Sequence, residues 1–154
     1  MQPSQLGAGI DKLVTLFTAA VAPVPVIDGA LVGSDWPAQW VVVGGDGIVD
    51  EEEDAGRVVQ SWNGLGAKTR NEDLTIPCAL GSSTGSAEAG MKARRDAALA
   101  LLALLEAALR ADPGLGNFTT GGAAAMSEMA MKYVTVTSGL AVVLTFNVDI
   151  PVRI

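Results

Sequence analysis

Apolar residues at helical spacing mark two segments of the chain. From residue 3 to about residue 21 they recur every three or four positions, as on one face of an amphipathic helix, and Pro23 and Pro25 then end the segment. The expected buried face of this helix consists of Ile10, Leu13, Val14, Phe17, Ala20 and Val21. A second helix is expected over residues 86–110, with Met91, Ala98, Leu101, Leu102, Leu105 and Leu109 on its buried face.

Four shorter apolar stretches predict strands between the two helices. Three of them cover residues 24–27, 40–43 and 57–62. The fourth shows strict alternation at Leu74, Ile76, Cys78 and Leu80, after a polar connection at 63–71. Pro77 lacks the amide proton of a ladder hydrogen bond, so this strand is expected to lie at a sheet edge or to carry a bulge.

The last third of the chain predicts a long β-hairpin. Every even position from 142 to 154 is apolar, and the residues between them are largely polar, as in a half-buried strand. If Ser138 and Gly139 form a two-residue turn, the facing residues have numbers that sum to 277. The expected pairs are then Met129 with Val148, Met131 with Phe146, Tyr133 with Leu144 and Thr135 with Val142.

This order of elements predicts a single α+β domain over residues 1–154. We expect a mixed, largely antiparallel sheet, with two helices packed on one face and the long C-terminal hairpin continuing the sheet. A chain of 154 residues is long enough to bury one sizeable core but too short for two large domains. The hairpin is longer than such a domain needs, so we expect it to reach beyond the core.

Composition excludes several classes of function. The chain has no histidine, which removes His-dependent hydrolase chemistry and the commonest metal ligand. Its net charge of -7, with only ten Lys and Arg residues, does not suit nucleic-acid binding. The single Cys78 is expected to be a small buried residue. No apolar run approaches the ~18 residues that a membrane helix needs. We also expect no catalytic residue, no cofactor and no metal ion.

Two motifs nevertheless resemble functional sites. Residues 81–85 match G-x-S-x-G between a predicted strand and a helix, so a small serine hydrolase centred on Ser83 is one alternative. The chain offers no base for that serine, and the competing interpretation is a turn whose hydroxyls cap the long helix. The acidic run Asp46, Asp50, Glu51, Glu52, Glu53 and Asp54 lacks the spacing of an EF-hand, so a solvated loop is favoured over a calcium site.

An ordered string of short segments covers nearly the whole chain. After the N-terminal helix, its segments are Pro25-Val26-Ile27-Asp28-Gly29, Trp40-Val41-Val42-Val43-Gly44-Gly45, Trp62-Asn63-Gly64-Leu65-Gly66-Ala67, Ile76-Pro77-Cys78, Arg94-Arg95-Asp96, Asp112-Pro113-Gly114-Leu115-Gly116 and the hairpin from Gly139 to Arg153. In this order the chain resembles the tail terminator (tail-completion, neck) proteins of long-tailed double-stranded DNA phages.

The resemblance implies a structural role without catalysis. Tail terminators assemble as a homo-hexameric ring on the head-proximal end of the tail tube, stop its polymerisation and present a surface to the head-side connector. The expected partners are therefore a second copy of the chain, the major tail tube protein and the connector. DNA would pass through the lumen without specific binding. The expected location is the virion tail or neck, with assembly in the host cytoplasm and no contact with a membrane.

Candidate interface residues follow from this reading. Contacts to a neighbouring subunit or the tube are expected at Trp62, Lys68, Arg70, Tyr133 and Arg153. The acidic residues Asp50, Glu51, Glu52, Glu53 and Asp54 are expected to face the lumen, where they would repel passing DNA, or to dock the connector. The alternatives are another head–tail joining or minor tail protein, the serine hydrolase using Ser83, and a generic scaffolding or binding domain.

Overall fold

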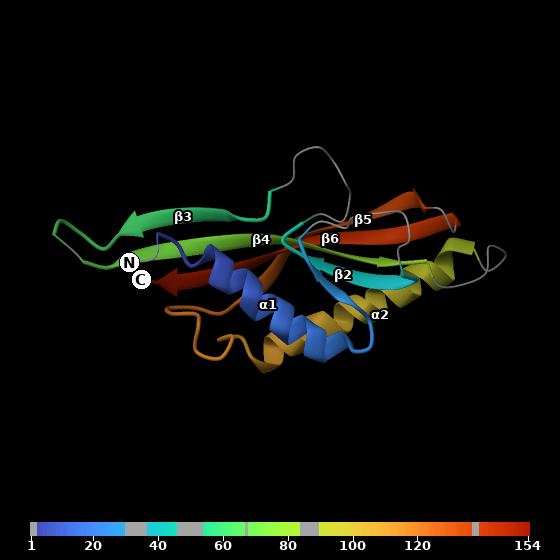
Figure 1. The fold of residues 1–154 in the computed structure, drawn as a ribbon, viewed down its shortest axis with the longest axis horizontal. Coiled ribbons are helices and arrows are strands. Elements are labelled where there is room, and N and C mark those ends of the chain that lie inside the picture. Colours follow the sequence, from blue (N-terminus) through green and yellow to red (C-terminus); the bar gives the residue numbers. More distant parts are fainter. Residues whose placement is uncertain (1–2, 30–36, 46–53, 67, 84–89, 137–138) are drawn as a thin grey trace.

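The computed structural model describes residues 3–29, 37–45, 54–66, 68–83, 90–136 and 139–154. It confirms the α+β fold, with two helices, a mostly antiparallel six-stranded sheet and a C-terminal β-hairpin (Figure 1). The elements are α1 (Leu6–Val21), β1 (Val26–Asp28), β2 (Gln39–Val43), β3 (Arg57–Trp62), β4 (Arg70–Ser82), α2 (Gly90–Ala111), β5 (Ala125–Val136) and β6 (Gly139–Arg153).

The long strands β4 and β6 form the centre of the sheet. They pair antiparallel over their whole length, from Asn71 opposite Arg153 to Ser82 opposite Val142. On the other side of β6 lies β5, and on the other side of β4 lie both β2 and β3, each along one half of that strand. Strand β1 pairs parallel with β2 and completes the order β1-β2-β4-β6-β5.

Both helices cover the same face of this sheet (Figure 1). The residues on that face alternate along β4 and β6 and form one core with α1 and α2, as the period-two pattern predicts. Helix α1 approaches the sheet closely at Gly9, where a Cβ atom would lie 3.0 Å from Leu74 and 3.3 Å from Ile76. A smaller cluster lies on the opposite face and consists of Trp40, Val42, Ala79 and Val143.

The prediction for Pro77 was wrong, because β4 is a central strand with no register shift along its ladders. The β2 ladder ends at Cys78 and the β3 ladder begins at Thr75, so Pro77 lies at the junction between them. Its carbonyl accepts hydrogen bonds from the amides of Gly44 and Gly45, at 2.8 and 3.0 Å. The missing amide proton therefore falls in the gap between two partner strands, where the ladder is interrupted anyway.

The predicted register of the hairpin was also wrong. Strand β6 begins at Gly139, which pairs with Val136, so facing residues near the turn sum to 275. Ser138, the first of the two residues of the predicted turn, lies outside the described residues. The pairing is shifted by two residues from the predicted one, and such a shift leaves every side chain on the same face of the sheet. Met131 and Tyr133 therefore still face the helices, opposite Leu144 and Val142.

A β-bulge in β5 adds a second difference from the predicted hairpin. Ser127 pairs with Asn147 and Ala130 with Thr145, which leaves Glu128 and Met129 opposite a single residue of β6. Glu128 has a φ of 52°, a conformation consistent with a bulge. As a result Met126, and not Met129, is the residue opposite Val148.

Candidate functional site

The hairpin between β3 and β4 ends in a tip whose side chains are exposed. Residues 63–69 connect the two strands, and Leu65 and Lys68 are both exposed there. Gly64 and Gly66 have φ angles of 124° and 79°, which favour glycine. At the base of the tip, Asn63 Nδ2 donates to Thr69 Oγ1 at 3.1 Å, and Asn71 Nδ2 donates to Asn63 Oδ1 at 2.9 Å. Side-chain hydrogen bonds between Asn63, Thr69 and Asn71 therefore fix the base of this loop.

An aromatic residue and an arginine stand beside each other just below this tip. Trp62 and Arg70 are directly opposite in the β3–β4 ladder, and the guanidinium carbon of Arg70 lies 5.7 Å from the centroid of the Trp62 ring. This is within the range of a cation–π contact. The contact holds the Trp62 ring in place although 63% of the residue remains exposed.

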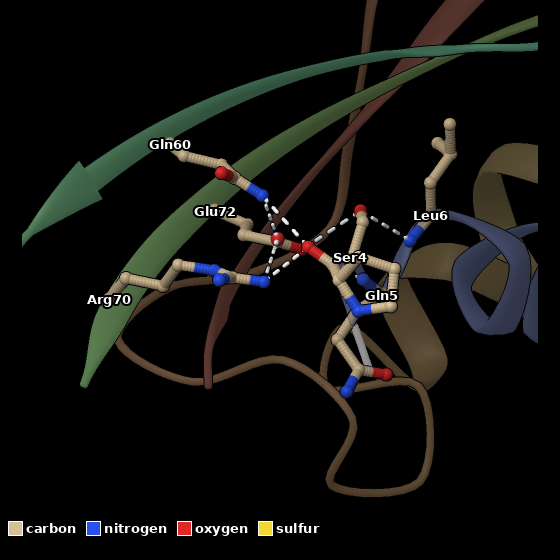
Figure 2. Close-up of polar contacts among 7 residues, drawn as sticks. Ser4, Gln5, Leu6, Gln60, Arg70 and Glu72 are labelled. Carbon is tan, nitrogen blue, oxygen red and sulfur yellow. Dashed lines mark hydrogen bonds and ion pairs between the residues drawn. The ribbon is translucent and has the colours of Figure 1, made fainter. Parts of the chain in front are cut away.

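A fully buried carboxylate lies next to this pair, on the helix side of β4 (Figure 2). Glu72 Oε2 accepts hydrogen bonds from the Gln5 amide at 2.8 Å and from Ser4 Oγ at 3.2 Å. Its Oε1 accepts one from Gln60 Nε2 at 2.6 Å and forms an ion pair with Arg70 at 3.5 Å. The carbonyl of Pro3 accepts further hydrogen bonds from Gln60 and Arg70.

This arrangement supplies the N-terminal cap of α1 from a distant strand. The side chain of Gln5, at the N-cap position, makes no capping hydrogen bond, although the first turn of a helix has unsatisfied amides and a partial positive charge. Glu72 accepts a hydrogen bond from the backbone amide of Gln5, and Ser4 Oγ accepts one from the backbone amide of Leu6 at 3.1 Å. The cluster therefore fixes the start of α1 to the base of the β3–β4 hairpin.

The predicted interface residues are divided between two places. Lys68 lies at the exposed tip and Trp62 is exposed just below it, whereas Arg70 belongs to the Glu72 cluster and only 11% of its side chain is exposed. Arg153 lies at the base of the same hairpin, where its Nε donates to Asn71 at 3.1 Å. Tyr133 lies elsewhere, on β5, where its hydroxyl accepts a hydrogen bond from Arg95 at 3.0 Å. Their contacts with other subunits stay predictions.

The other two motifs fall partly outside the described residues. Asp50, Glu51, Glu52 and Glu53 are not described, and Asp54 is exposed and pairs with Arg57 at 3.4 Å. The hydroxyl of Ser83 donates to the carbonyl of Ala38 at 3.3 Å, and its amide donates to the same oxygen at 2.8 Å. Ser83 therefore extends the pairing of β2 with β4, while the expected cap of the long helix lies outside the described residues.

Two buried charged residues were missed from the sequence. Glu72 lies two residues before Leu74 and four before Ile76. Alternation along a strand therefore places its side chain on the same, core-facing side. Arg94, also buried, lies on the core face of α2, where Nη1 donates to the Gly90 carbonyl at 3.3 Å and Nε has no partner. Helical spacing places Arg94 one turn before Ala98, but its charge argued against burial.

Cys78 is buried as expected, and its thiol is expected to be inert in the folded protein. Burial raises its pKa from 9.0 to about 12, against a smaller opposing effect of a hydrogen bond with the Gly44 backbone. The reactive thiolate is therefore suppressed. Alkylation by iodoacetamide should proceed only in the unfolded chain, as mass spectrometry across a urea series would show. Rapid labelling of the native protein would contradict this burial.

The same pKa shift predicts a pH dependence of stability. Above about pH 9 the thiol ionises in the unfolded chain but not in the folded one, so the unfolded state binds fewer protons. The free energy of unfolding should fall as pH rises from 9 toward 12. Comparing urea titrations of the wild type and Cys78→Ala isolates this slope from that of other groups, and equal slopes would contradict it.

Within the part of the chain that the structure describes, no three metal-ligating side chains gather at one place, and neither helix has the length and hydropathy to cross a membrane. No protein-family model matches the chain, and no curated protein matches it.

Proposed function

We propose that this protein is a non-enzymatic structural subunit of a long-tailed phage virion. In this proposal it is a tail terminator, which forms a homo-hexameric ring on the head-proximal end of the tail tube. The ring stops tube polymerisation, joins the tail to the head-side connector and lets DNA pass through its lumen. Residues 50–54 face that lumen in this proposal, and a ring map with these residues on the outer rim would contradict that part.

The observation that carries the proposal is the placement of large exposed apolar side chains at both ends of the sheet. Trp62 and Leu65 are exposed on the β3–β4 hairpin, and Met129 and Tyr133 are exposed on β5. Figure 1 shows β3 and β5 toward opposite ends of the molecule. Exposed apolar groups at two separate places favour contacts with protein partners, and a ring subunit needs two such surfaces. The ordered sequence resemblance supports the same class of protein.

Electron microscopy tests this function directly. The purified protein is imaged at high concentration, alone and with tail tubes polymerised from the tube protein of the same genome. Six-fold rings that cap one tube end and block further extension are the expected result. Tubes that remain uncapped and extendable would contradict a terminator, and density bound only to the connector would indicate another head–tail joining protein. Labelling of Ser83 by a serine-reactive phosphonate would contradict the non-enzymatic part.

A variant of the hairpin tip makes this experiment more specific. Leu65→Ser with Lys68→Glu changes two exposed side chains and leaves the buried Arg70 cluster intact. It is expected to lose ring assembly or tube capping without a change in stability, because neither side chain packs against the core. Lys12→Glu, on the exposed side of α1, is the matched charge reversal that should cap normally.

A further inference from the structure

Strands β3 and β5 each have a partner on one side only. Among the described residues β3 pairs with β4 and β5 pairs with β6, and no strand lies on the outer side of either. Each outer side therefore presents peptide N–H and C=O groups that can pair with a further strand. The remaining edge strand, β1, is three residues long and offers a much shorter ladder.

Three large exposed side chains of the two edges, Trp62, Met131 and Tyr133, lie on the same face of the sheet, whereas the exposed Val59 of β3 lies on the other face. Trp62 is opposite Arg70, on the helix side of β3 and β4. Met131 and Tyr133 are opposite Leu144 and Val142, which belong to the core under the helices. Trp62, Tyr133 and Met131 are 63%, 57% and 38% exposed, respectively. A sheet that continued from one edge into the other would bring these side chains together on one face.

The strand directions also match. Strand β3 runs antiparallel to β4, whereas β5 is antiparallel to β6 and therefore runs in the direction of β4. A second copy placed beside the first, in the same orientation, thus presents β3 antiparallel to β5. The lengths are similar too, with six residues in β3 and seven in β5 between the bulge and the turn.

We propose that copies of this chain join head to tail by antiparallel pairing of the β3 edge of one copy with the β5 edge of the next. Trp62 of one copy then packs against Met131 and Tyr133 of its neighbour. The inference rests on the proposed function, since it names the contact that would build the ring. Because the two surfaces differ, each copy keeps one free edge of each kind until the assembly closes.

The position of the two edges suits a closed assembly. Strand β3 pairs with the first half of β4. Strand β5 pairs with the part of β6 that lies opposite the second half of β4, and it extends beyond the end of β4. Pairing them displaces each copy along the strand direction as well as across it. In a closed ring, that displacement corresponds to strands inclined to the ring axis, as in a β-barrel.

Both aromatic rings are held by arginines of their own chain. Arg70 lies over Trp62, and Arg95 Nη1 donates to the Tyr133 hydroxyl at 3.0 Å. Side chains that are already ordered lose less entropy on binding, and aromatic residues are typical anchors of protein interfaces. These contacts favour Trp62 and Tyr133 as the centre of the interface.

Disulfide cross-linking tests the pairing in several registers at once. Ser61→Cys is combined in one chain with Ala130→Cys, Lys132→Cys or Val134→Cys, which sample the opposite sheet face along β5. At least one combination should give a ladder of linked species on oxidation, in the free protein at high concentration or on tail tubes. The native Cys78 is buried and does not contribute. Ser61→Cys with Ala103→Cys, on the exposed side of α2, should give no ladder.

Charge substitutions give a second measurement. Trp62→Asp and Tyr133→Asp should each weaken self-association about tenfold or more in sedimentation experiments, with an unchanged circular dichroism spectrum. Leu99→Asp, a matched change of an exposed apolar residue on α2, should leave association unchanged.

The outcomes separate this inference from the proposed function. Rings that cap tubes but show no ladder with any of the three pairs would overturn the strand pairing and leave the terminator. A ladder in a protein that never caps tubes would support the pairing and overturn the terminator. A ladder of equal yield in the α2 control would mean random collision and overturn the pairing.

Discussion

Replacing Glu72 by alanine is expected to lower the free energy of unfolding by about 3–5 kcal/mol, a large part of the stability of a domain of this size. The carboxylate is fully buried and accepts from Ser4, Gln5 and Gln60 besides pairing with Arg70. Its removal would leave the largely buried guanidinium of Arg70 without the carboxylate that it pairs with. The backbone amide of Gln5, at the start of α1, would lose its acceptor. Urea denaturation followed by circular dichroism measures the loss.

Two further variants separate charge from packing at this position. Glu72→Gln keeps the shape and one acceptor but loses the charge, so we expect an intermediate loss of about 1–3 kcal/mol. Asp73→Ala removes the neighbouring carboxylate, which is exposed on the opposite face, and should change stability by less than about 0.5 kcal/mol. Equal losses in Glu72→Ala and Asp73→Ala would contradict the capping role.

Replacing Trp40 by alanine is expected to cost about 3–5 kcal/mol. Trp40 is 2% exposed although it lies on the sheet face away from both helices. Its ring covers the backbone of Gly81, where a Cβ atom would overlap with it. Removing the ring would leave a cavity lined by Val42, Ala79 and Val143. Thermal and urea unfolding, both followed by circular dichroism, measure the effect.

Trp62 provides a matched control within the same chain. It is an exposed tryptophan on β3, and its contact with Arg70 is its one aromatic interaction among those described. Trp62→Ala should therefore lower the free energy of unfolding by less than about 1 kcal/mol. If the two alanine variants lost the same stability, the cluster around Trp40 would not be a packed core.

Periodicity predicted the elements of this fold well, because both helices and β6 each bury one regular face, although β5 stays largely exposed. The buried residues Leu13 and Phe17 of α1, and Leu101 and Leu105 of α2, lie where the spacing placed them. The position of β4 was misjudged from Pro77, because the rule about its missing amide proton does not foresee that the ladders of β2 and β3 stop at Cys78 and Thr75, on either side of Pro77. That meeting of strands depends on long-range pairing.

The polar contacts were harder to anticipate than the fold. Arg70 was grouped with Lys68 as an interface residue, yet it pairs with Glu72 on the same strand, and both residues are contacted by the distant N-terminal residues Pro3 and Gln5. The hairpin register failed for two local reasons: β6 begins at Gly139 opposite Val136, and the bulge at Glu128 adds a residue that alternation alone does not reveal. Apolar spacing therefore predicts which face a residue occupies better than it predicts which polar partner it has.

The two ends of the described chain also have a practical consequence for experiments. Pro3 is bound by Gln60 and Arg70, and Ile154 exchanges two backbone hydrogen bonds with Arg70, at 2.9 and 3.0 Å. Both ends therefore lie beside the base of the β3–β4 hairpin (Figure 1). An affinity tag or fluorescent protein fused at either end would crowd Trp62 and the hairpin tip.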